Sequence, residues 1–249
     1  MIKVNVFILL LTVYIINHSS AAPNKPKGNL SCPEQLKEVD RIFKVLLLIS
    51  KRRLLPKDDA KHTEYCKDVT SLGKKVNRYS KCEKPFAAQV LTILSNGVKK
   101  PIKYICNEKK QVSMENFGCM TDQFIDQLNE KESYLIKNLK YITNNASSAE
   151  ALPLFCCSMV DFLDSLTKIE PAKCSSSPNV HTGKFIHQRI SSGAADVLDL
   201  VCSTYKNVKT CDEKIPSVMT TLRTPAPKGF SIDKEPFATY FIGAVTKMS

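Results

Sequence analysis

Hydrophobic side chains recur every three or four residues along most of the chain, which is the spacing of one face of an α-helix. Six stretches carry such a stripe, with charged and polar residues between the apolar positions. They cover residues 31–47, 66–79, 86–98, 124–142, 151–169 and 185–201. Strict alternation of apolar and polar residues, which would indicate β-strands, is almost absent. The pattern therefore predicts an all-α fold.

Prolines, glycines and polar runs separate these stretches. Pro56 should end the first helix, because a proline ring cannot continue the hydrogen bonding of a helix interior. Gly97 and Pro101 should kink or split the third stretch. Loops are expected near residues 56–62, 107–113, 143–149 and 171–183.

Residues 1–22 have the organisation of a secretory signal peptide. Lys3 precedes an apolar run over residues 6–16, and small residues follow at 19–22. The run is shorter than the roughly twenty residues that cross a bilayer, which disfavours a membrane anchor. No later stretch looks long and apolar enough to span a membrane. We therefore expect a cleaved signal and a secreted, extracellular protein.

Ten cysteines follow the signal segment, and export brings them into an oxidising compartment. Five disulfides are expected, although the spacing does not reveal their pairing. A zinc site is the alternative, but there is no C-x-x-C pair. Cys156 and Cys157 are neighbours that point about 100° apart on a helix, so each should bond a different distant partner. The disulfide residues are Cys32, Cys66, Cys82, Cys106, Cys119, Cys156, Cys157, Cys174, Cys202 and Cys211.

The chain after the signal divides into two parts. Residues 23–211 should form a cysteine-rich helical bundle that disulfides staple near the helix ends. Residues 212–249 contain four prolines and no cysteine, which predicts an irregular C-terminal tail. An apolar run over residues 237–245 either packs on the domain or stays loose.

Two N-glycosylation sequons follow the signal segment. They begin at Asn29 and Asn145. Asn145 lies in a polar stretch and is the one more expected to be exposed.

Known catalytic patterns are missing. Adjacent cysteines on a helix invite comparison with secreted phospholipases A2, but Val160 takes the place of their histidine, so the general base is absent. His62, His181 and His187 are expected to be surface groups. We predict a protein that is not an enzyme and has no cofactor and no metal; a hydrolase is the weakest alternative.

The chain is basic, with 36 lysines and arginines against 24 aspartates and glutamates. Lys67, Lys74, Arg78 and Lys81 fall on one helical stripe, and Lys75 adjoins it. This stripe could hold a sulfated glycan, anionic lipid head groups or an extracellular receptor. An ordinary solvated helix face is the alternative. Nucleic acid is a poor partner, since no aromatic-interleaved motif appears.

Helices that disulfides hold apart can also enclose an apolar cavity. Such a cavity would suit a carrier of an apolar small molecule or lipid. The alternative is that these stripes of phenylalanine and leucine pack into an ordinary hydrophobic core without a cavity, which is the more common case.

The cysteine skeleton resembles that of arthropod cysteine-rich, all-helical secreted proteins of the haemolymph-glycoprotein type. The resembling positions are Tyr65-Cys66, Tyr79-Ser80-Lys81-Cys82, Gly97, Tyr104-Ile105-Cys106, Cys119, Cys156-Cys157 and Cys174. The resemblance implies secretion, glycosylation and a helical disulfide-bonded fold, and it supplies no catalytic residues. The function of that family is undefined. Our first interpretation is an apolar-ligand carrier or body-fluid protein, and the second is a basic extracellular effector that binds anionic glycans or a receptor.

Overall fold

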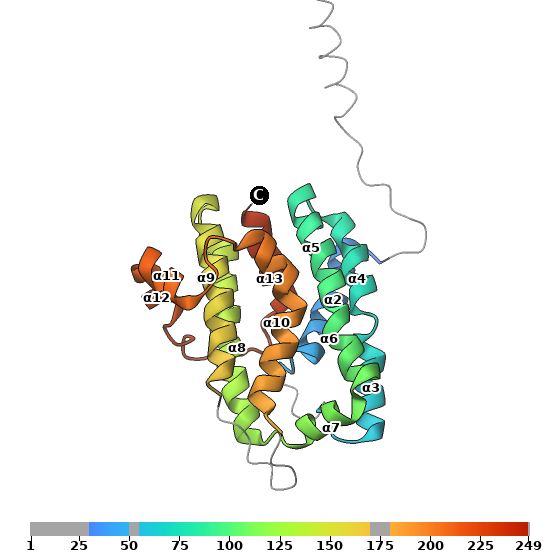
Figure 1. Ribbon diagram of the computed structural model, residues 1–249. Coiled ribbons are helices and arrows are strands. Elements are labelled where there is room, and N and C mark those ends of the chain that lie inside the picture. The colour runs from blue at the N-terminus through green and yellow to red at the C-terminus, as the bar shows by residue number, and fades with distance from the viewer. Residues whose placement is uncertain (1–29, 50–54, 170–179, 249) are drawn as a thin grey trace, which may run out of the picture. The chain divides into compact units, whose positions relative to one another are not determined.

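The computed structural model describes residues 30–49, 55–169 and 180–248, and all regular secondary structure in these ranges is helical (Figure 1). The longer helices are α2 (Cys32–Leu46), α3 (Asp59–Val69), α4 (Leu72–Tyr79), α5 (Pro85–Gly97), α7 (Lys110–Gly118), α8 (Asp122–Asn145), α9 (Ser148–Thr167), α10 (Thr182–Val201) and α13 (Phe237–Lys247). Short elements are η2 (Ser80–Cys82), α6 (Lys99–Lys103), the π-turn η3 (Tyr104–Glu108), α11 (Val208–Lys214) and α12 (Pro216–Leu222). The predicted all-α fold is confirmed. The expected signal segment, 1–22, lies outside the described residues.

Two of the predicted helices are each divided. The stripe over 66–79 breaks between α3 and α4, where the hydroxyl of Thr70 donates to Cys66 O (2.7 Å) and that of Ser71 donates to Asp68 O (3.0 Å). Such side-chain bonds compete with backbone donors for the carbonyls of a helix end. The stripe from 86 onward divides at Val98 into α5 and α6, as Gly97 and Pro101 suggested.

Three expected loops are largely helical. The loop expected over 143–149 is reduced to Ala146 and Ser147, between α8 and α9. Within 107–113, helix α7 begins at Lys110. Within 56–62, helix α3 begins at Asp59, because the Asp58 side chain accepts a hydrogen bond from Lys61 N at 2.8 Å and caps the helix. The first helix ends well before Pro56: α2 stops at Leu46, and Leu48 takes a positive φ of 63°.

Disulfides join helices that are far apart in the sequence. The pairs are Cys32–Cys82, Cys66–Cys106, Cys156–Cys202 and Cys157–Cys211. Cys119 is also disulfide-bonded, and Cys174 lies outside the described residues. The neighbours Cys156 and Cys157 bond different partners, as predicted, and so tie α9 to the end of α10 and to α11.

The C-terminal segment corrects the expectation of an irregular tail over 212–249. It holds α12 and α13, and α13 packs against α8, α2 and α9. Phe237 and Phe241 are each 6% exposed, and the Asp40 carboxylate accepts from Ala238 N at 2.8 Å to hold the start of α13. The prediction failed because the prolines at 225, 227 and 236 lie in the connection before α13, while the apolar run itself is a helix that can be buried on most sides.

Helix α10 lies between α9 on one side and α5 with α6 on the other (Figure 1). Its Gly193 meets Gly97 of α5 so closely that a Cβ atom on Gly97 would lie 2.3 Å from Gly193 O. Only glycine at position 97 permits this approach of the two backbones, which sets how near α10 comes to α5.

We expect Gly97→Ala to destabilise the protein by at least about 2 kcal/mol, because a rigid backbone oxygen must move to admit the methyl group. Gly118→Ala is the matched control, since it adds the same methyl group at the end of α7 with nothing within 4 Å. It should leave stability unchanged or raise it by up to about 1 kcal/mol. Urea unfolding measures both; equal effects of the two substitutions would contradict the tight contact.

Candidate functional site

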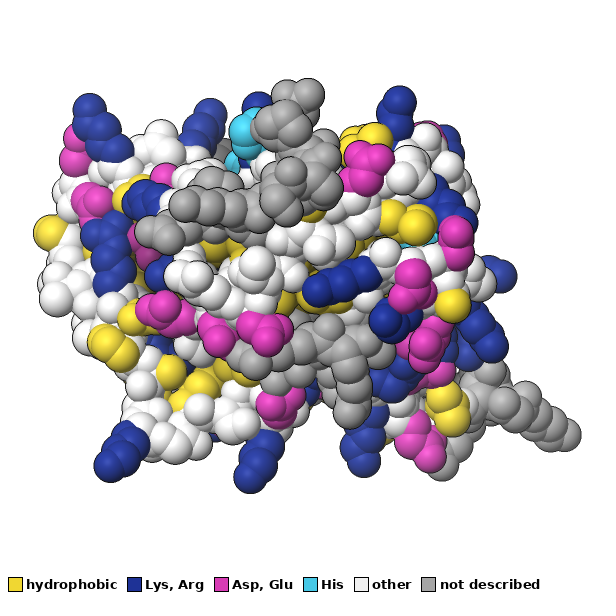
Figure 2. All heavy atoms as spheres, turned by 90° about the horizontal axis from the view of Figure 1, so that it is seen from below, with side chains coloured by type: hydrophobic (Ala, Val, Ile, Leu, Met, Phe, Trp, Pro, Cys, Tyr) yellow, Lys and Arg dark blue, Asp and Glu magenta, His cyan; other side chains and the backbone are white. Residues whose placement is uncertain are grey.

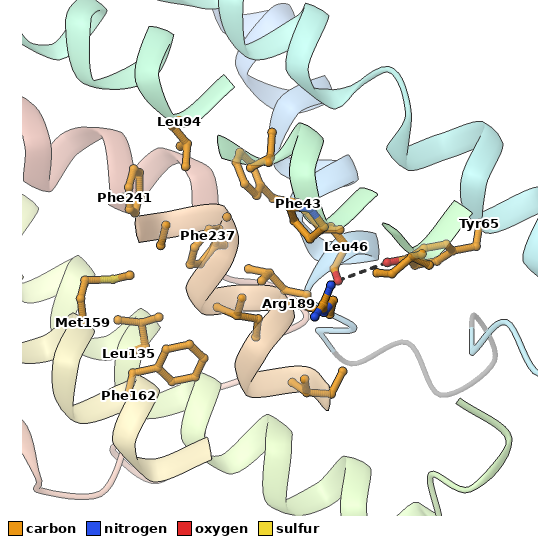
Figure 3. A pocket seen from close by; sticks show the side chains of 18 of the residues that line it. Phe43, Leu46, Tyr65, Leu94, Leu135, Met159, Phe162, Arg189, Phe237 and Phe241 are labelled. Atoms are coloured by element: carbon orange, nitrogen blue, oxygen red, sulfur yellow. Dashed lines mark hydrogen bonds between the residues drawn. The ribbon is translucent and has the colours of Figure 1, made fainter. Parts of the chain in front are cut away.

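An apolar cavity lies where helices from both ends of the chain meet along α10 (Figure 3). The α10 side chains Ile186, Arg189, Ile190 and Ala194 line it, opposite side chains of α2, α5, α8, α9 and α13. Its aromatic wall consists of Phe43, Tyr65, Phe117, Phe162, Phe237 and Phe241. The apolar faces of the helices therefore form the hydrophobic core, and they also line a cavity inside that core.

The cavity measures about 80 Å³, counted as the space open to the centre of a water molecule. Pockets for drug-sized ligands hold about 300–1,000 Å³. The cavity thus fits a short or medium-length apolar chain rather than a large ligand.

Aromatic rings fix the wall of this cavity. The ring centroids of Phe43 and Phe237 are 5.7 Å apart, and those of Phe237 and Phe241 are 6.0 Å apart. These separations lie within the range in which aromatic pairs attract each other. The Tyr65 hydroxyl donates a hydrogen bond to Leu46 O at 3.5 Å. Burial raises the pKa of Tyr65, so this side chain stays neutral.

Arg189 is the one charged side chain among the described residues that line the cavity. Its guanidinium carbon lies 3.8 Å from the ring centroid of Tyr104, in a cation–π contact, and 5.9 Å from that of Phe185. Its Nε atom is buried and has no hydrogen-bond partner. In the part of the chain that the structure describes, no carboxylate pairs with it. The site is therefore an apolar cavity with one cation at its edge, and no carboxylate of the described residues pairs with this cation (Figure 3).

A second hollow, of about 220 Å³, lies between α8 and α9 and is polar. Its cations already have acidic partners: Arg223 Nε is 2.9 Å from Asp161, and Lys168 Nζ is 2.6 Å from Asp164. A ligand there would have to displace these pairs. The apolar cavity is the better candidate, because its single cation has no such partner.

The five basic residues predicted to bind an anionic partner do not share one helix. Lys67 lies on α3, Lys74, Lys75 and Arg78 on α4, and Lys81 in η2, so the prediction of a single helical stripe is wrong. All but Lys75 are exposed and form no ion pair among the described residues, whereas Lys75 pairs with Glu38 of α2. On the face that Figure 2 shows, positive and negative side chains are interspersed.

The histidines do not gather at one site. His62 is 3% exposed, which corrects the expectation of a surface group. Its Nε2 lies 3.1 Å from Ile105 O, and its ring abuts the sulfur of Cys66, so it bridges α3 and η3 beside their disulfide. His181 is exposed and His187 is half-buried. In the described ranges, no three His, Cys, Asp or Glu side chains gather as metal ligands would.

Asn145 is the exposed last residue of α8. The serine of its sequon, Ser147, begins α9, where its N and Oγ donate to one carboxylate oxygen of Glu150 at 3.0 and 2.7 Å. These bonds lower the pKa of Glu150. The other sequon residue, Asn29, lies outside the described residues.

The sequence analysis missed Arg189, although the sequence carries a signal for it. The buried face of α10 includes Phe185, Ile186, Gly193 and Val197, with Ile190 half-buried beside them, and position 189 falls within that stripe. A lone arginine at an apolar position of a helical stripe must either find a partner or face a cavity. That conflict is visible without a structure.

Comparisons with known proteins give no relative. No protein-family model matches the chain, and neither a curated protein sequence nor a solved structure matches it. Across 30–49, 55–169 and 180–248, no helix combines the length and apolar character needed to cross a bilayer.

Glu132 is an acidic group in the core close to the cavity wall. It lies one turn before the lining residue Leu135 on α8, is 2% exposed, and has no hydrogen-bond partner for either carboxylate oxygen. Burial raises the pKa of Glu132 well above its usual range. The carboxyl is therefore protonated in the folded protein over a range of pH in which the unfolded chain has lost the proton.

Because the folded state holds this proton more tightly, the free energy of unfolding should fall as pH rises above about 4.5, by up to about 1.4 kcal/mol per pH unit until Glu132 ionises. Glu132→Gln should remove that slope, and Glu130→Gln, an exposed position on the same helix, should retain it. Urea unfolding between pH 4.5 and 8 gives the comparison. Parallel pH profiles for wild type and Glu132→Gln would show that the carboxyl is not buried and neutral.

Proposed function

We propose that the protein is a secreted, non-catalytic carrier of a small apolar ligand, which it binds in the cavity along α10. The observation that carries the proposal is the wall of this cavity: rings and aliphatic side chains from eight of the longer helices face one space, and one charged group adjoins it. Ligand pockets in proteins combine a mostly apolar lining with few polar groups in this way.

The covalent frame supports the same proposal. A ligand cavity inside a small helical bundle tends to close by collapse of its walls, because empty space forfeits packing contacts. Here Cys156–Cys202 and Cys157–Cys211 fix α9 to the segments that follow it, and Cys66–Cys106 fixes α3 beside the cavity residue Ile105. Helices held in this way can keep a space between them.

Secretion and glycosylation are part of the proposal. The organisation of residues 1–22 and the disulfides support export, since disulfides persist in oxidising compartments. The exposed position of Asn145 supports an attached glycan. The likeness of the cysteine skeleton to haemolymph-type glycoproteins of arthropods agrees with both.

A substitution that places a large side chain in the cavity tests this proposal. We expect wild-type protein to bind 1-octanol, a neutral probe, and Ala194→Phe to lower that affinity at least tenfold, because the new ring occupies the space beside α10. Gln188→Phe adds the same ring at an exposed position of the same helix and should leave binding unchanged. Titration calorimetry gives the affinities, and circular dichroism checks the folding of each variant.

An absence of 1-octanol binding by the wild type, or equal binding by a folded Ala194→Phe variant, would reject the cavity as the binding site.

A second candidate function is the binding of an anionic glycan or receptor surface. Lys74 and Arg78 favour it, because they are one turn apart on α4, exposed, and without an acidic partner in the described residues. Lys67 and Lys81 lie on the adjoining elements. Exposed cations without local counter-charges attract polyanions.

For this function we expect retention on a heparin column at physiological salt, which Lys74→Glu/Arg78→Glu should abolish. Lys206→Glu/Lys228→Glu makes the same change in net charge at two other exposed positions and should have a smaller effect. Equal losses for the two double variants would mean that net charge alone causes retention, and no retention by the wild type would reject the candidate.

A further inference from the structure

Arg189 indicates what kind of apolar ligand the cavity takes. Arginine keeps its charge at any physiological pH and offers five N–H donors in a planar fork. Arg189 is half-buried at the edge of the cavity, and its buried Nε has no hydrogen-bond partner among the described residues. A donor that is buried without a partner costs free energy, which an anion bound at this edge of the cavity would recover.

The contact with Tyr104 leaves the guanidinium free to bind an anion. The aromatic ring lies against its face, with 3.8 Å between the guanidinium carbon and the ring centroid. Stacking on the face does not use the N–H groups at the edge, which are the ones that bind a carboxylate in bidentate fashion. Tyr104 is only half-buried, so this end of the cavity adjoins the surface.

The charge count favours a carboxylate as the head group. One cation compensates one negative charge, and among the described residues lining the cavity there is no second cation for a doubly charged phosphate monoester. The rest of the wall, with Phe162, Met159 and Phe241, offers contact to hydrocarbon only. The ligand must therefore combine a single anionic head with an apolar tail.

We propose that the ligand of this cavity is an aliphatic carboxylic acid of short or medium chain length, whose carboxylate pairs with Arg189 while its tail lies among the rings. The inference rests on the proposed carrier function and specifies the ligand class of the same cavity. The cavity, at about 80 Å³, is small beside the pockets of drug-sized ligands, which favours a short or medium chain over a long-chain lipid.

The experiment compares octanoic acid with 1-octanol, which has the same chain and a neutral head, by titration calorimetry at pH 7.5. We expect the wild type to bind octanoate about tenfold or more tightly than 1-octanol, as a charge-assisted hydrogen-bonded pair predicts. Arg189→Met should remove this preference, so that octanoate and 1-octanol bind with similar affinity. Lys184→Met, which removes an exposed cation from the same helix, should preserve it.

Arg189→Lys provides a second variant that keeps the charge. It should retain part of the preference for octanoate, because an ammonium group cannot form the bidentate pair. It also serves if the methionine variant fails to fold.

The outcomes separate the two proposals. Equal affinity of the wild type for octanoate and 1-octanol, with both lost in Ala194→Phe, would overturn the carboxylate inference and leave the carrier function in place. A preference for octanoate that persists unchanged in both Arg189 variants would overturn the assignment of Arg189. If neither probe binds, the carrier function itself is rejected.

Discussion

The position of α10 is the constraint on which the rest of the structure depends. On one side, Gly193 lies against Gly97 of α5, and position 97 leaves no room for a larger side chain without movement of the backbone. On the other side, the disulfide between Cys156 and Cys202 ties the end of α10 to α9. Held from both sides, α10 presents the side chains at 186, 189, 190 and 194 to a space that its neighbours do not fill.

The C-terminal helix closes this arrangement. Helix α13 brings Phe237 and Phe241 into the wall of the cavity and packs on α8 and α2, which come from the middle and the beginning of the chain. Polar contacts fix its start: Asp40 accepts from Ala238 N, and Glu235 pairs with Lys140 of α8 at 2.9 Å. The cavity therefore forms only when α2 and α13 are both packed in place, although α13 itself contains no cysteine.

Much of the fold could be predicted from the sequence, because buried helix faces repeat every three or four residues and leave a visible stripe. The long helices α8, α9 and α10 and the separate partners of Cys156 and Cys157 followed from local spacing. The break at Thr70 and Ser71 did not, since it depends on hydroxyl bonds to carbonyls that the stripe does not reveal. Helix α13 was missed because nearby prolines outweighed an apolar run that contains none.

The candidate site was less predictable than the fold, because it depends on contacts between distant segments. The burial of His62 follows from its contact with Ile105, 43 residues further along the chain. The basic residues chosen from spacing proved to lie on three elements rather than one. Arg189 was overlooked, although its stripe on α10 places it beside apolar side chains. The informative feature was a charged residue, Arg189, at an apolar position of a helical stripe.

A crystal structure of the protein with 8-bromooctanoic acid would test the account most directly, since the anomalous signal of bromine locates the end of the acyl chain. The account predicts a bromine peak inside the cavity, near Met159 or Phe162, with the carboxylate within hydrogen-bonding distance of the Arg189 guanidinium. Bromine found only on the surface, with side chains of α9 and α13 filling the space beside α10, would contradict it.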